Sequence, residues 1–266
     1  MYSGGTGMIE TVSKQQSGIA DINKISMDAP WQWLNLAAKD FMHKPLVSLF
    51  HGSLFTVAAI VIVVGLSMQG YTSIILALAG GFLIVGPMLA VGLYEKSRLI
   101  EAGERVHLGE LLKASFKSPV GLAYVGILLM VIYLFWVRLA MIIFALFFGL
   151  GGFPPVNEFL GNLLLTGEGV SMLVVGTIAG GVLAAGTFMV TAVSVPMLMD
   201  RRCDTFSAVA TSIRAVVQNP APMALWAALI AGIMAVGMAV GFVGVMFSFP
   251  LIGHATWHAY KALVQD

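Results

Sequence analysis

The chain has 266 residues, of which 59% are hydrophobic and only 10% are charged, and its mean hydropathy is +0.93. Soluble domains carry about 25% charged residues, so this composition excludes an ordinary soluble fold and predicts a membrane protein surrounded by the lipid bilayer. The formal net charge of +1 gives no basis for nucleic-acid binding. The single cysteine, Cys203, excludes an internal disulfide and a cysteine-only metal site.

The first 28 residues are polar and contain no apolar run of the kind that marks a signal peptide. We therefore predict a disordered cytoplasmic tail over residues 1–28. A single transmembrane domain is expected to follow over residues 29–266.

Apolar runs after this tail predict an all-α membrane fold with six spanning helices, because about 20 apolar residues cross the hydrocarbon. The last uncharged stretch, 220–260, is long enough for two spans joined by a turn near Gly241. The alternative is one long span followed by an amphipathic helix on the membrane surface. The predicted spans are 46–68, 73–94, 120–148, 170–199, 221–240 and 243–262.

The basic residues predict the orientation of these spans. Thirteen of the fourteen Lys and Arg residues fall on one side of the predicted spans, and the opposite loops, 69–72 and 149–169, have none. By the positive-inside rule, the basic side and both termini face the cytoplasm.

The six spans form three hairpins that share a pattern of prolines. An amphipathic segment precedes each hairpin, and a proline, Pro45, Pro119 or Pro220, follows each segment. The second span of each hairpin contains another proline, Pro87, Pro196 or Pro250. The amphipathic segments cover residues 31–41, 108–115 and 206–217. We interpret this pattern as an internal repeat of hairpins, each entered through a helix on the cytoplasmic surface. Chance is the alternative, since proline is frequent in membrane helices.

Two histidines near the C-terminus are candidate cofactor ligands. His254 and His258 are four residues apart, so they share one helix face and could bind haem or a divalent metal ion. The alternative is a polar and aromatic belt at the membrane interface, together with Trp257 and Tyr260.

A second candidate site follows from the repeat. Glu95, Asp204 and His258 each stand eight residues after the proline of a second span, so a threefold bundle would place them at equivalent levels. Two carboxylates and one imidazole could hold a divalent metal. Ordinary interfacial ion pairs with Arg98 or Arg201 are the alternative.

Arg138 is the one charge in the interior of a predicted span, and Glu158 in the following outer loop is its predicted partner. Such a residue can mark a substrate or anion contact. The alternative is that its side chain reaches the outer interface and forms a local ion pair. The sequence contains no hydrolase motif, and we predict no catalytic residue.

Three strings, at residues 28–34, 87–95 and 253–260, resemble a bacterial family of uncharacterised integral membrane proteins. Some members of that family carry the label cytochrome c oxidase subunit I. The resemblance implies a bacterial inner-membrane location. The five histidines of this chain are too few for a haem–copper catalytic subunit, so the label suggests only an association with a respiratory complex.

These observations favour a non-catalytic accessory subunit or assembly factor of a larger inner-membrane complex, which the resemblance suggests is a respiratory oxidase. Its partners would be the lipid bilayer and other membrane protein subunits. A small transporter or channel is the first alternative, because repeats and spans interrupted by Gly and Pro are frequent in transporters. A haem- or metal-binding protein that uses His254 and His258 is the second.

Overall fold

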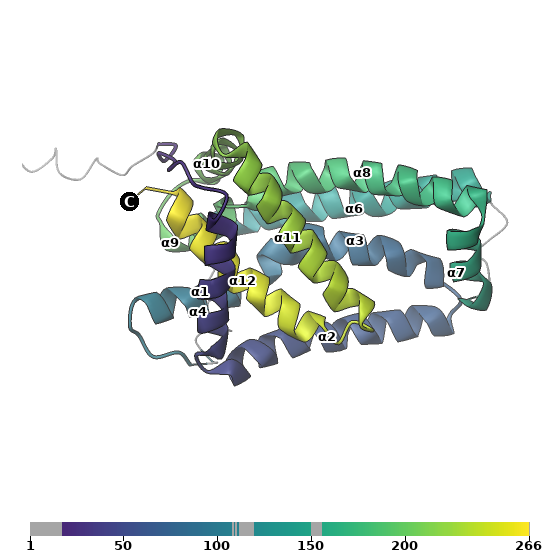
Figure 1. The fold of residues 1–266 in the computed structure, drawn as a ribbon, viewed down its shortest axis with the longest axis horizontal. Helices are drawn as coiled ribbons and strands as arrows, with labels where there is room; N and C mark the ends of the chain where they lie inside the picture. The colour runs from purple at the N-terminus through teal and green to yellow at the C-terminus, as the bar shows by residue number, and fades with distance from the viewer. Residues whose placement is uncertain (1–17, 108, 110, 112–119, 150–155, 266) are drawn as a thin grey trace, which may run out of the picture.

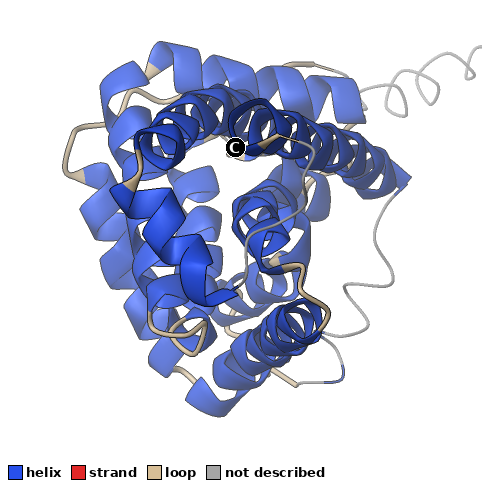
Figure 2. Ribbon diagram, turned by 90° about the vertical axis from the view of Figure 1, so that its right-hand side faces the viewer, coloured by secondary structure: helices blue, strands red, loops and turns tan. Residues whose placement is uncertain are grey.

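The computed structural model describes every residue except 1–17, 108, 110, 112–119, 150–155 and 266. Within this part of the chain all regular elements are α-helices, and the β interaction is a single isolated bridge between Ile22 and Val264 (Figure 2). The prediction of an all-helical fold is confirmed.

Long helices run along the longest axis of the molecule (Figure 1). They are α2 (Pro45–Met68), α3 (Thr72–Leu89), α6 (Val120–Phe148) and α8 (Gly167–Thr191). After short breaks, α4 (Val91–Glu101) continues α3 and α9 (Ser194–Asp200) continues α8. The bounds of α2 and α6 agree with the predicted spans within one residue.

Five helical segments of the described chain are long and apolar enough to cross a membrane, whereas the sequence predicted six. They are Pro45–Met68, Ile74–Glu101, Val120–Phe148, Gly167–Asp200 and Pro220–Ala239. The predicted sixth span is α12 (Val245–Leu263), which is not among them. Its second half carries His254, Thr256, His258 and Lys261, which lower its hydropathy.

The last two helices, α11 (Pro220–Ala239) and α12, are joined by a turn at 240–244 in which Gly241 has a φ of 61°. Figure 1 shows that this turn stops short of the end of the bundle at which α7 (Val156–Leu165) lies. Most of α12 is buried against α1, α2, α4 and α11, so it does not lie on the surface. The chain therefore returns along α12 to the opposite end of the bundle. We call this end, at which α12 and α1 lie together, the polar end.

Two short helices, α1 (Ala29–Met42) and α10 (Thr205–Gln218), lie at the polar end, and α1 crosses the long helices at a steep angle (Figure 1). Helix α10 buries small residues such as Ala208 and Thr211, whereas its apolar residues Phe206 and Val217 are 78% and 64% exposed. Its apolar stripe is thus available to lipid or to another protein. Most of the predicted amphipathic segment 108–115 lies outside the described residues.

The described part of the predicted tail is bonded to the folded domain. Backbone N–H groups of Ala20 and Ile25 donate to Thr211 Oγ1 and Asn219 Oδ1, at 3.1 and 3.0 Å. The N–H of Asn23 donates to the carbonyl oxygen of Leu263 at 2.8 Å. Residues 20–25 thus form a packed segment, in contrast to the disordered tail predicted over residues 1–28.

The prolines take several structural positions. Pro45 and Pro220 are the first residues of α2 and α11, where the missing N–H costs nothing. Pro87 and Pro196 lie beside the breaks that separate α3 from α4 and α8 from α9, whereas Pro250 lies inside the continuous α12. Pro119 lies outside the described residues, and the internal repeat stays a prediction.

Candidate functional site

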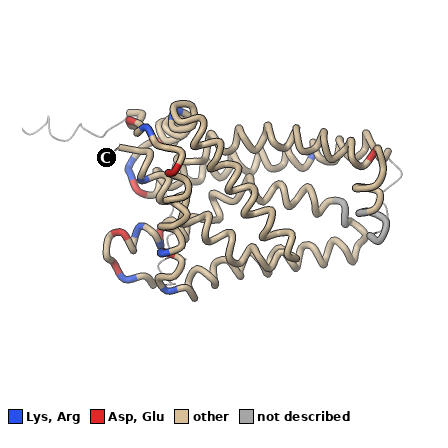
Figure 3. The backbone as a smooth tube through the Cα atoms, viewed as in Figure 1, with Lys and Arg blue, Asp and Glu red and all other residues tan. Residues whose placement is uncertain are grey.

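Most charged residues of the described chain lie at the polar end of the bundle, near the C-terminus (Figure 3). Beneath them a group of polar side chains is buried where α1, α2, α4 and α12 meet. We call this group the buried network. Its members are Asp40, Ser48, Lys96, Ser97, His254 and His258.

Lys96 is the cation of the buried network, and its side chain is completely removed from solvent. Its ammonium group donates to the carbonyl oxygen of Asp40 at 2.9 Å and to Ser48 Oγ at 2.7 Å. A longer contact of 3.4 Å reaches the carbonyl oxygen of Lys44. Three acceptors thus match the three N–H donors of the ammonium group. Lys96 therefore links α4 to the end of α1 and the start of α2.

His254 on α12 is also fully buried and is bonded at both ring nitrogens. Its Nε2 lies 2.9 Å from Ser48 Oγ, and its Nδ1 lies 2.8 Å from Ser97 Oγ. Because the ammonium of Lys96 can only donate, Ser48 Oγ accepts from it and its own hydroxyl proton is free for Nε2. With the ring proton on Nδ1, Nε2 accepts from Ser48 and Nδ1 donates to Ser97, and both nitrogens are bonded in either tautomer.

Asp40 on α1 is the anion of the buried network. His258 Nε2 donates to Asp40 Oδ2 at 2.8 Å. Burial on its own would raise the pKa of the Asp40 carboxyl, but hydrogen bonds from His258 and Ser97 hold it below its ordinary value of 3.8. The carboxylate is therefore ionised over the physiological range.

The hydrogen bonds of the buried network form one continuous chain. Lys96 donates to Ser48, Ser48 is bonded to His254, His254 is bonded to Ser97, and Ser97 is bonded to the carboxylate of Asp40. Such a chain joins a cation to an anion through three neutral groups and fastens α12 to α1, α2 and α4. It could also pass a proton between its two ends, because each neutral member both donates and accepts.

A second polar group lies next to the buried network on α12. The hydroxyl of Tyr260 donates to Asp200 Oδ2 at 2.7 Å and accepts from Arg201 Nε at 2.9 Å. Lys261 Nζ lies 3.6 Å from the same Asp200 oxygen. Trp257 Nε1 donates to Glu101 Oε2 at 3.0 Å. These contacts fasten the C-terminal turns of α12 to the ends of α4 and α9.

The predicted ligands His254 and His258 lie on one face of α12, but protein partners occupy them. Haem iron or a metal ion would have to displace Ser48 or Ser97 to reach a nitrogen of His254. The Nε2 atom of His258 is likewise hydrogen-bonded to Asp40.

The three predicted metal ligands Glu95, Asp204 and His258 have separate partners. Glu95 accepts from Arg98 at 2.7 and 2.9 Å. Asp204 caps α10 by accepting from the N–H and hydroxyl of Ser207, and these bonds lower the pKa of its carboxyl. Among the described residues, no group of three or more His, Cys, Asp or Glu side chains is placed to hold a metal ion.

Arg138 lies on an exposed face of α6, consistent with a position beside lipid or a neighbouring protein. Glu158 belongs to α7, but its side chain is outside the described part of the structure. The predicted contact between Arg138 and Glu158 therefore falls outside the described residues.

Sequence reasoning missed most of the buried network. It identified His254 and His258 but counted Lys96 among the basic residues of a cytoplasmic loop. No sequence motif marked Ser48, Ser97 or Asp40. A usable signal was the adjacent pair Lys96–Ser97, which stands two and three residues after Tyr94, the last residue of the apolar run.

Comparison with known proteins agrees with this architecture. Residues 74–200 match the model of a family described as predicted integral membrane protein (DUF2189). The chain is an integral membrane protein. The matched segment covers most of α3 and all of α4, α6, α7, α8 and α9, and it includes the string 87–95 on which the sequence resemblance partly depends. No curated protein and no solved structure matches the chain.

The match supports a family of membrane proteins without an assigned activity. It does not extend to the label cytochrome c oxidase, which stays a hypothesis. Two of the three resembling strings, 28–34 and 253–260, lie outside the matched residues.

Proposed function

We propose that this integral membrane protein is a non-catalytic accessory subunit or assembly factor of a larger complex in a bacterial inner membrane. The observation that supports this role is the contrast between the inside and the outside of the polar end. Inside, ionisable groups that could perform chemistry bond one another, as Lys96 and Asp40 do through the buried network. Outside, α10 presents Phe206, Ile213 and Val217, which suit contact with another apolar surface.

The proposal places the polar end and both termini in the cytoplasm. The support is the positive-inside rule, applied to the basic residues that gather at that end (Figure 3). Helices α1 and α10 would then lie at the cytoplasmic surface of the membrane, where a partner subunit could reach them. A respiratory oxidase is the first complex to test, because the resemblance of the sequence suggests it.

The other two functions have less support. A transporter for polar solutes needs polar groups along its path, whereas two cavities between helices of the described chain are lined almost entirely by apolar side chains. A haem or metal protein needs free imidazole nitrogens, whereas both nitrogens of His254 are bonded.

Affinity purification of the full chain from native membranes tests the proposal. We expect a stoichiometric complex to copurify, and we expect the double variant Phe206→Ser with Val217→Ser to lose it. The matched control is Val182→Ser, which changes a 72% exposed residue of α8 within a span. Isolation of the wild-type chain as a homo-oligomer alone would contradict the proposal. A haem absorption band in the purified protein would instead favour the redox alternative.

A further inference from the structure

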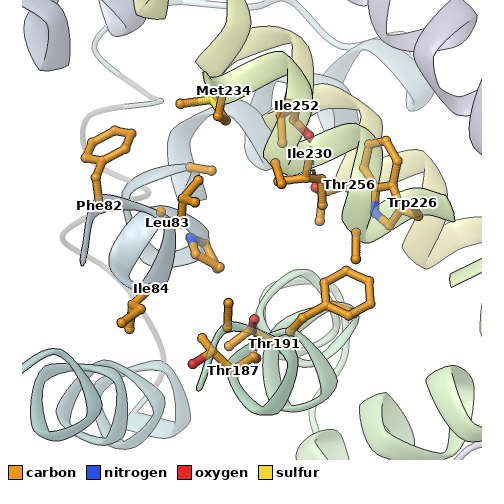
Figure 4. Close-up of a pocket in the computed structure, with 18 of the residues that line it drawn as sticks. Phe82, Leu83, Ile84, Thr187, Thr191, Trp226, Ile230, Met234, Ile252 and Thr256 are labelled. Carbon is orange, nitrogen blue, oxygen red and sulfur yellow. Dashed lines mark hydrogen bonds between the residues drawn. The ribbon is translucent and has the colours of Figure 1, made fainter. Parts of the chain in front are cut away.

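An apolar cavity of about 340 Å³ lies between α3, α8, α11 and α12, and no member of the buried network lines it. Figure 4 shows Phe82 and Leu83 on one side of it, Trp226 on the opposite side, and Thr187 and Thr191 on a third. Its volume is within the range of about 300–1,000 Å³ that is usual for small-molecule sites.

The cavity is open toward the bilayer. Gly181, Ala184 and Ala185 of α8 and Ala231 of α11 line it, and all four are exposed at the surface of the protein. Their small side chains leave a lateral opening between α8 and α11. An apolar molecule can enter from the membrane through this opening without crossing water.

One buried polar atom in the wall of the cavity has no hydrogen-bond partner within the described chain. Trp226 is completely buried and packs edge-on against Trp33, with ring centroids 5.6 Å apart. Its indole Nε1 has no hydrogen-bond partner among the described residues. Figure 4 shows the indole nitrogen on the edge of the ring that faces the other lining side chains. Since an indole N–H can only donate, the missing partner is an acceptor.

The hydroxyl groups of the three threonines that line the cavity are not free to donate to a ligand. Thr187, Thr191 and Thr256 each donate a hydroxyl proton to a backbone carbonyl one turn earlier in their own helix, at 2.8 to 2.9 Å. The site therefore offers a largely apolar volume in which the indole N–H of Trp226 is a buried donor without a partner in the described part of the protein. The matching ligand is a long apolar molecule that carries a hydrogen-bond acceptor.

The depth of Trp226 indicates which acceptor this is. Trp226 is six residues after Pro220, so it lies about 9 Å along α11 from the polar end. The headgroup layer of a bilayer leaflet is about 5–7 Å thick, which puts the ester carbonyls of a glycerolipid near the depth of Trp226. The acyl chain below that carbonyl would run toward Met234, two turns deeper on α11.

We propose that this cavity binds one acyl chain of a glycerolipid whose ester carbonyl accepts a hydrogen bond from Trp226 Nε1. The indole positions the ester, and the walls of α3, α8 and α12 enclose the chain. Neither step requires the accessory role proposed above. Lipid binding and partner capture are measured separately, so either can fail alone.

The test compares two lipids that differ only in the carbonyl. The purified, delipidated full-length protein is titrated in detergent with dioleoyl phosphatidylethanolamine and with its ether-linked analogue, and the bound lipid is measured by native mass spectrometry. We expect the ester lipid to bind the wild-type protein about tenfold more tightly, the ratio that one hydrogen bond provides. In Trp226→Phe, which keeps an aromatic ring but removes the N–H, the two lipids should bind equally.

A second pair of variants tests the cavity itself. Gly181→Leu places a side chain at the opening, and Gly176→Leu makes the same change on α8 outside the cavity. A Cβ atom at either glycine meets nothing within 4 Å, so both proteins should fold. We expect Gly181→Leu to lose the ester lipid and Gly176→Leu to retain it. Equal binding of ester and ether lipids by the wild type, equal retention by both glycine variants, or a quinone copurifying in place of phospholipid would overturn the proposal.

Discussion

At the scale of single residues, Lys96 is a cation in a fully buried environment, which is unfavourable for a charge. A lysine with no exposed surface gives up its hydration, which is recovered only if every N–H finds an acceptor. The two backbone carbonyls and Ser48 provide those acceptors, and Asp40 supplies a negative charge nearby. Lys96 is therefore expected to be a determinant of stability as well as a member of the buried network.

Replacing Lys96 with Met removes the charge and keeps most of the side-chain volume. We expect Lys96→Met to cost about 3 kcal/mol of stability, because Ser48 and the carbonyls of Asp40 and Lys44 lose a partner in a buried site. Thermal unfolding of the purified protein in detergent measures the change. Lys39→Met, an exposed substitution on α1, is the control and should unfold at the wild-type temperature. An unchanged unfolding temperature for Lys96→Met would show that the buried network is not structural.

Asp40 gives the protein a dependence on low pH. Its pKa is lower in the folded protein than the ordinary 3.8, so its contribution to stability is complete above about pH 4 and is lost as the pH falls through the folded value. His254 and His258 from α12 and Lys96 from α4 face it. As the pH is lowered below about 4, we expect the unfolding temperature of the wild type to fall by more than that of Asp40→Asn, because only the wild type loses the charge of Asp40. Parallel pH profiles for the two proteins would contradict this assignment.

At this scale the sequence predicts residue types better than partners. The helical spacing of His254 and His258 correctly places both on one face of α12. Their partners come from α1, α2 and α4, at separations of 157 to 218 residues along the chain, and no local pattern encodes such contacts.

At the scale of helices, the packing of α2 against α12 depends on a glycine. A Cβ atom at Gly52 would overlap the carbonyl oxygen of Met246 and approach Pro250 Cγ to 2.9 Å. The backbone of α12 cannot move aside as a flexible side chain would. This close approach brings Ser48, one turn earlier on α2, within reach of His254.

We expect Gly52→Leu to force α2 and α12 apart and to cost about 3 kcal/mol, at the upper end of the usual range for overpacking. The matched control is Gly65→Leu in the same helix, where a Cβ atom meets nothing within 4 Å. That control should be neutral or slightly stabilising, because glycine is a poor helix former. Thermal unfolding of both variants gives the comparison, and equal stability would mean that the helices separate at little cost.

Helix positions were predictable because apolar length is a strong signal in membranes, as the close agreement for α2 and α6 shows. The number of spans was less predictable. The stretch that contains α12 is uncharged over most of its length, yet its polar residues turn toward other helices instead of toward water. Hydropathy alone does not reveal that such a helix is enclosed by its neighbours.

At the scale of the whole molecule, the side of the membrane on which the chain ends lie sets the orientation of every helix in the membrane. Gln265, the last described residue, donates its backbone N–H to the carbonyl oxygen of Asp21 at 3.1 Å, so the two ends of the described chain lie together at the polar end. Fixing the side of the membrane on which one residue of that end lies therefore fixes both termini. The positive-inside rule predicts the cytoplasmic side.

Cys203 makes this orientation directly measurable, because it is the only cysteine of the chain and lies between α9 and α10 at the polar end. In intact spheroplasts we expect a membrane-impermeant maleimide to leave Cys203 unmodified and a permeant maleimide to modify it. Burial raises the pKa of the Cys203 thiol, so the reaction should be run at mildly alkaline pH and repeated after lysis, when both reagents should react. A variant that combines Cys203→Ser with Gln69→Cys, in the exposed turn between α2 and α3, should show the reverse accessibility. Modification of Cys203 by the impermeant reagent before lysis would place the polar end outside the cell, and the search for partner subunits would then move to that side of the membrane.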